Sequence, residues 1–102
     1  GDLLLEREMT KTEQEHHQAC LNRFIELANQ MKEEGTAAPV VSAAMMSASA
    51  VYATYVTTGN TGGLTDSGVD KVTAAYKQHL QRVQQMRKAE DDKRRADAAG
   101  GA

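Results

Sequence analysis

Residues 39–58 read PVVSAAMMSASAVYATYVTT and contain no charged side chain. Pro39 suits the first turn of a helix, because its missing N–H would have no partner there. A helix that is nearly uncharged on every face is normally surrounded by other protein. The stretch therefore predicts a helix over 39–58 that is covered by its neighbours. Its apolar stripe advances in steps of four, three, four and three through Val41, Met45, Ala48, Tyr52 and Tyr55.

A second helix is predicted before this stretch, at about 12–34. Thr12 and Glu15 have the spacing of a capping box at its start, and Gly35 is a natural stop after its end. Residues 1–9 are predicted to be an added or upstream extension, since Met9 and the residues after it read like a translation start. The apolar stripe of this helix steps by three, four and three through Leu21, Phe24, Ala28 and Met31.

A third helix is predicted at about 67–88, with Ser67 as its N-cap and Asp70 in its first turn. The glycine-rich segment 59–63 connects it to the preceding helix. No large apolar residue follows Met86, so residues 89–102 are predicted to form a flexible tail of charged and small side chains. The stripe on the third helix runs through Val69, Val72, Tyr76, Leu80, Val83 and Met86.

These elements predict an all-α fold, a small three-helix domain over residues 10–88 with antiparallel neighbours. Tyr52, Tyr55 and Tyr76 are expected to turn their rings inward. In 102 residues, only a modest core can form. The free energy gained by burying its apolar surface is about equal to the conformational entropy lost on folding, so the net stability is near zero. We therefore expect the helix at 39–58 to complete its burial in a homo-oligomer, most simply a two-fold dimer.

Three segments resemble a small bacterial family catalogued as a domain of unknown function, DUF3144. The run 23–30, RFIELANQ, resembles its F-I-x-L-A-N signature, 41–50 resembles its V-S-A-A-L-M-Y-A-A-A segment, and 76–80 resembles a later tyrosine-containing helix. The resemblance covers about 24–86. It departs from the family pattern at Ser47, where an aromatic residue is common, and in the glycines of the connection. It implies a compact helical fold and brings no established activity.

Composition excludes several classes of protein. The net charge of −2 lacks the basic excess of a general nucleic-acid binder. The single cysteine cannot form an intrachain disulfide, and the start of the chain does not read as a signal peptide, so we expect a cytoplasmic protein. Six hydroxyl residues and the absence of Leu, Ile and Phe argue against a membrane span at 39–58.

Candidate chemistry is sparse. His16, His17 and Cys20 are the one cluster of metal-ligand residue types, with each histidine one helical turn from the cysteine. We interpret the histidines as solvated and Cys20 as a small core residue, so no metal or cofactor site is assigned. No acid–base pair or activated nucleophile is identifiable, and no catalytic residue is named. The glycines of 59–63 lack the spacing and lysine of a phosphate-binding loop.

The function predicted from the sequence is that of a small helical, non-enzymatic protein-interaction or assembly module. The expected partner is a second copy of the chain, as a homodimer, or another protein, with no nucleic acid and no membrane. The alternative is a small-ligand or metal-binding helical protein that uses the cluster at His16, His17 and Cys20 or an apolar pocket between helices.

Overall fold

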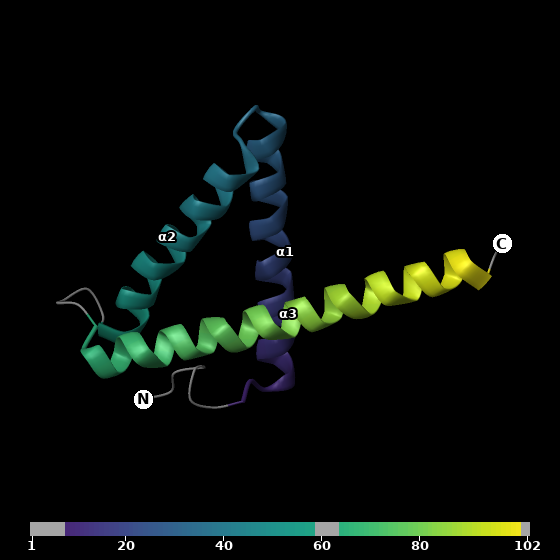
Figure 1. Ribbon diagram of the computed structural model, residues 1–102. Coiled ribbons are helices and arrows are strands. Elements are labelled where there is room, and N and C mark those ends of the chain that lie inside the picture. Colours follow the sequence, from purple (N-terminus) through teal and green to yellow (C-terminus); the bar gives the residue numbers. More distant parts are fainter. Residues whose placement is uncertain (1–7, 59–63, 101–102) are drawn as a thin grey trace. The chain divides into compact units, whose positions relative to one another are not determined.

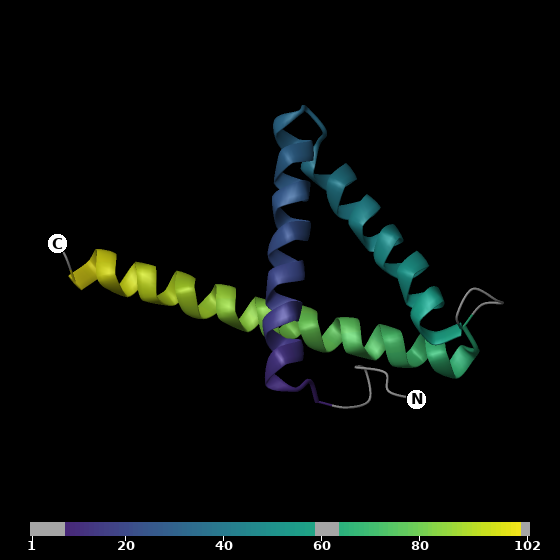
Figure 2. The same cartoon turned by 180° about the vertical axis from the view of Figure 1, so that it is seen from behind.

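The structure is a computed structural model that describes residues 8–58 and 64–100. It contains α1 (Lys11–Glu33), α2 (Ala38–Thr58) and α3 (Asp66–Gly100), and no strand occurs within those ranges (Figures 1 and 2). The predicted all-α class with three helices is confirmed. The chain divides into two units, Gly1–Leu64 and Thr65–Ala102, which are described separately. The predicted glycine-rich connection 59–63 and most of the extension 1–9 lie outside the described residues.

The start of α1 is a capping box, but not the predicted one. The Glu13 N–H donates to the Thr10 hydroxyl oxygen at 3.2 Å, and the Thr10 N–H donates to Glu13 Oε1 at 3.0 Å. The predicted box at Thr12 and Glu15 is therefore wrong by two residues. The earlier box lets the helix begin at Lys11 and adds backbone hydrogen bonds to it.

The end of α1 is a Schellman turn centred on Gly35. The Thr36 N–H donates to the Met31 carbonyl and the Gly35 N–H donates to the Lys32 carbonyl, each at 3.0 Å. Gly35 has a φ of 106°, in the left-handed region that side chains disfavour. The predicted stop is confirmed, and it is made by backbone conformation together with these two hydrogen bonds.

The helix α2 begins directly after this turn and contacts α1. The Ala37 carbonyl accepts the first bonds of the helix, from the N–H groups of Val40 and Val41, at 3.0 and 3.1 Å. Pro39 lies in the first turn, as predicted, where it removes no helical hydrogen bond. Val41, one turn into α2, is 6% exposed and is the one residue of the described ranges that counts as buried.

The helix α3 starts earlier and ends later than predicted. The Thr65 hydroxyl accepts from the Gly68 N–H at 3.1 Å, and the Thr65 carbonyl accepts from the Val69 N–H at 2.9 Å. Thr65, not Ser67, therefore caps this helix. At the other end, α3 continues beyond the predicted 88 to Gly100, because small and charged residues with good helix propensity follow without a break. The division of the chain into 1–9, 10–88 and 89–102 stays a prediction.

The apolar stripes predicted on the three helices exist, but neither unit covers them by itself. Leu21, Phe24 and Met31 of α1 are exposed, as are most large apolar residues of α2 and α3. The three tyrosines were predicted to turn inward, and this is wrong for the chain by itself, because Tyr52 is 68% exposed and the other two are about half exposed. Each unit, taken by itself, thus leaves apolar helix faces exposed within the described residues.

Candidate functional site

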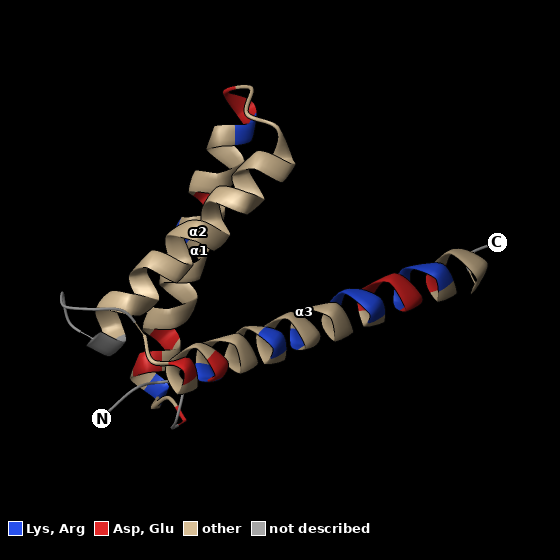
Figure 3. Ribbon diagram, turned by 60° about the vertical axis from the view of Figure 1, so that its left-hand side comes forward, with Lys and Arg blue, Asp and Glu red and all other residues tan. Residues whose placement is uncertain are grey.

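The largest unusual surface of the molecule is α2 itself. Residues 38–58 have no charged side chain, and Figure 3 shows the helix without Lys, Arg, Asp or Glu along its length. We call this surface the charge-free helix surface. Its large exposed residues are Val40, Met45, Met46, Val51, Tyr52, Tyr55 and Val56. Soluble monomers rarely leave so continuous an apolar surface in water unless it is an interaction site.

Local contacts already organise this surface. The rings of Tyr52 and Tyr55 meet edge to face, with centroids 6.4 Å apart and an interplanar angle of 84°. The Thr54 hydroxyl donates to the Val51 carbonyl at 2.7 Å, so that hydroxyl bonds within its own helix. The aromatic pair therefore presents a preformed apolar ridge, which suits contact with another protein surface.

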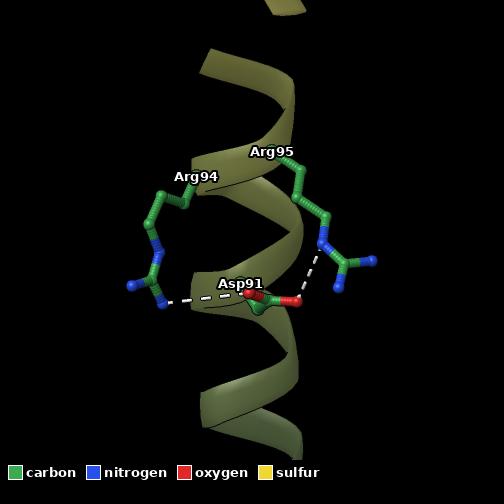
Figure 4. Close-up of polar contacts among 3 residues, drawn as sticks. All are labelled: Asp91, Arg94 and Arg95. Carbon is green, nitrogen blue, oxygen red and sulfur yellow. Dashed lines mark ion pairs between the residues drawn. The ribbon is translucent and has the colours of Figure 1, made fainter. Parts of the chain in front are cut away.

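The second notable surface is the charged end of α3, residues 87–100. Asp91 forms ion pairs with two arginines, with Arg95 Nε at 3.1 Å from its Oδ2 and Arg94 Nη2 at 3.9 Å from its Oδ1 (Figure 4). These are exposed ion pairs at the i,i+4 and i,i+3 spacings, and each contributes a few tenths of a kcal/mol at most. Positive and negative side chains are mixed along this segment, as is typical of a solvated helix end.

The predicted metal-ligand residues do not form a site. His16, His17 and Cys20 all lie exposed on α1, so the expected core position of Cys20 is wrong for the single chain. Within residues 8–58 and 64–100, no group of three or more His, Cys, Asp or Glu side chains is placed to hold a metal ion. The assignment of no catalytic, cofactor or metal residue stays a prediction.

An open depression lies on α1 beside the same cysteine. It is lined by Cys20, Arg23, Phe24 and Leu27, which follow the one-turn spacing of a single helix face. Phe24 and Leu27 are themselves exposed. A depression of this kind does not enclose a small molecule, since ligand pockets bury most of their ligand's surface. The sequence already places Phe24 in the apolar stripe of this helix, and Cys20 and Leu27 widen that stripe.

Two other interpretations of the sequence were a phosphate-binding loop and a membrane span. The possible phosphate loop at 59–63 lies outside the described residues. The segment Ala38–Val56 is long enough and apolar enough to cross a bilayer, with a mean hydropathy of 1.2, by length and composition only. That property alone is weak evidence, because core helices of soluble proteins share it.

The comparisons with known proteins fit the sequence resemblance. The model of a family described as "Protein of unknown function (DUF3144)" matches residues 17–86. The match spans most of the chain, including α2 and the apolar half of α3, and this chain belongs to that family. The predicted resemblance over about 24–86 is thus confirmed and extended toward the N-terminus. Comparison with curated proteins and with solved structures found no match.

Proposed function

We propose that this DUF3144 protein is a non-enzymatic interaction or assembly module whose charge-free helix surface binds protein. The supporting observation is that residues 38–58 carry no charged side chain and that most of the large apolar residues of α2 between Val40 and Val56 are exposed. Burying apolar surface yields about 25 cal/mol per Å², so several exposed Val, Met and Tyr side chains together provide a substantial driving force.

The partner we propose is a second copy of the chain, most simply in a two-fold dimer. A helix with apolar residues on all faces can contact α1 on one side and the same helix of another copy on the other side. Within each copy, the short connection at 34–37 favours antiparallel packing of α1 and α2. A cytoplasmic, bacterial setting without nucleic acid or membrane completes the proposal, with another protein as the alternative partner.

The test is the oligomeric state of the full chain and of Met46→Lys, measured by light scattering and sedimentation equilibrium at micromolar concentration. Met46 is exposed on α2, and an unpaired ammonium buried at an interface costs several kcal/mol. We expect the wild type to be a dimer and the variant to dissociate more than a hundredfold more readily.

Gln81→Lys on the polar side of α3 is the matched control, because it adds the same charge outside the charge-free surface. It should leave the dimer intact. A wild-type monomer with normal helical content would contradict self-assembly, and would direct the search to other proteins. Recovery of the wild type with lipid vesicles rather than as a dimer would favour a membrane role for α2.

The alternative of metal or small-ligand binding has its own discriminator. Metal analysis of protein purified without chelator, together with the melting temperature of Cys20→Ser, tests the cluster on α1. Bound metal in stoichiometric amount, lost in the variant, would favour that alternative over the assembly module. In the described part of the chain the three side chains lie exposed, and no group of three or more His, Cys, Asp or Glu is placed to hold a metal ion.

A further inference from the structure

We propose that α3 pairs antiparallel with α3 of a second copy of this chain, through a seam that runs from Val69 to Met86. The proposal rests on the self-assembly proposed above and adds the second helix, the direction and the register of contact. Its premise is an apolar stripe that the unit Thr65–Ala102 does not bury by itself. Val69, Tyr76, Leu80, Val83 and Met86 are between 48% and 59% exposed, and Val72 is half-buried.

Five of the six stripe residues follow the seven-residue repeat of a coiled-coil seam, and Leu80 lies beside the seam at the fifth position. Val69, Tyr76 and Val83 occupy the first position of successive heptads, and the fourth positions hold Val72, His79 and Met86. The next residues at these positions are Glu90, Lys93 and Asp97, so the repeat loses its apolar character after Met86. At about 1.5 Å per residue the seam is about 26 Å long. So short a seam is weak alone and supplements the surface on α2.

The antiparallel direction places apolar residues of one seam opposite apolar residues of the other. In an antiparallel pair, first positions of one helix face fourth positions of the other. A register that aligns Val69 with Met86 of the second copy also aligns Val72 with Val83, and Tyr76 with His79. The two-fold symmetry makes each contact twice, so the four outer layers are wholly apolar and each of the two central layers places a Tyr76 ring against a His79 imidazole. A central polar contact of this kind is a common way to specify register.

The charges beside the seam favour the same direction. Asp66 and Arg87 flank opposite ends of the seam, both at the fifth heptad position. In the antiparallel register they face each other across the pair, and the two-fold symmetry makes this contact twice. A parallel, in-register pair would instead place Arg82 of each copy opposite Arg87 of the other. That arrangement puts like charges together twice, which destabilises a coiled coil.

Disulfide trapping tests the direction. In a Cys20→Ser background, Val69→Cys and Met86→Cys are prepared separately as full chains, then mixed and oxidised under mild conditions. The antiparallel pair predicts rapid cross-linking between the two variants and slow cross-linking of either with itself. Fast self-cross-linking of each variant would overturn the proposal in favour of a parallel pair. Dimers that form no cross-link at either position would overturn it in favour of another occupant of the seam.

Charge exchange tests the flanking contacts without touching the apolar residues. Arg87→Asp should weaken the dimer about tenfold, and the double variant Asp66→Arg with Arg87→Asp should restore it. Lys88→Asp makes the same charge change on the outer side of α3 and should leave the dissociation constant within about twofold. Equal effects of the two single variants, or no recovery in the double variant, would contradict the proposed register.

These outcomes separate this proposal from the function proposed for α2. A monomeric wild type removes the assembly and this pairing together. If Met46→Lys dissociates the dimer but the cross-linking and charge-exchange results differ from those expected, the proposed assembly stands. Only the pairing of α3 is then removed.

Discussion

The α1–α2 pair and the charged end of α3 are both helical and largely exposed, but they relate to water in opposite ways. Residues 87–100 carry Asp91 and its two arginine partners, and the charged side chains along the segment keep it solvated. Residues 38–58 have no charged side chain that could keep them solvated. The comparison shows that a helical backbone says little about a segment's surroundings. The side chains distinguish a helix suited to water from one suited to protein.

The two regions also differ in how their helices are held. The α1–α2 pair depends on a capping box, a Schellman turn and the buried Val41. The charged end of α3 depends on interactions between residues three and four apart. Substitutions in the first region should therefore cost more stability than substitutions in the second.

The largest effect is expected at Gly35. Gly35→Ala places a side chain at a φ of 106°, which should lower the free energy of unfolding by about 1–2 kcal/mol. Urea denaturation followed by circular dichroism measures the change. Gly100→Ala is the matched control, since a Cβ at either glycine meets no atom within 4 Å and only Gly35 has a positive φ. Equal stability changes in the two variants would show that the Schellman turn is not under conformational constraint.

A smaller effect is expected at the start of α1. Thr10→Ala removes the hydroxyl that accepts from the Glu13 N–H and should cost about 1 kcal/mol. Thr12→Ala, at the threonine that lies inside α1, should change the same urea midpoint by less than half as much. The reverse order would indicate that the helix begins at the capping box predicted from the sequence.

The smallest effect is expected in the charged end of α3. Asp91→Ala removes both ion pairs to Arg94 and Arg95 and should lower stability by less than about 0.5 kcal/mol. The loss should shrink further in high salt, because exposed charges are screened. Asp92→Ala removes the same charge outside these contacts. A loss above 1 kcal/mol in far-UV melts, specific to Asp91, would show that this segment is stabilised by more than solvated charge.

The class of fold was predictable because three apolar stripes of helical period stand between clear breaks. The helix starts were less predictable. The residues around Thr10 and Thr12 offer two overlapping capping boxes, and those around Thr65 and Ser67 offer two caps. In both places the structure uses the earlier residue, which lengthens the helix and adds backbone hydrogen bonds. Local spacing does not distinguish such neighbours, because each would satisfy the orphan N–H groups of the first turn that it starts.

The sequence could not show which surface covers the apolar stripes, and the reason is different. An apolar face such as that of Leu21, Phe24 and Met31 packs equally well against its own chain or another copy. The expectation that Cys20 and the tyrosines lie in a core followed from assuming intrachain cover. The candidate surface on α2 was predictable, since the absence of charge is itself a pattern. The edge-to-face tyrosine pair was not, because the tyrosine spacing does not specify ring orientation.

The charge-free surface also has a consequence for colloidal behaviour. A formal charge of −2 on 102 residues gives weak long-range repulsion between molecules. With so little repulsion, an uncovered apolar helix promotes non-specific association and precipitation as concentration rises. The partner that covers α2 would then act as a solubilising agent for the chain. The abundance of the soluble protein would be coupled to its state of assembly.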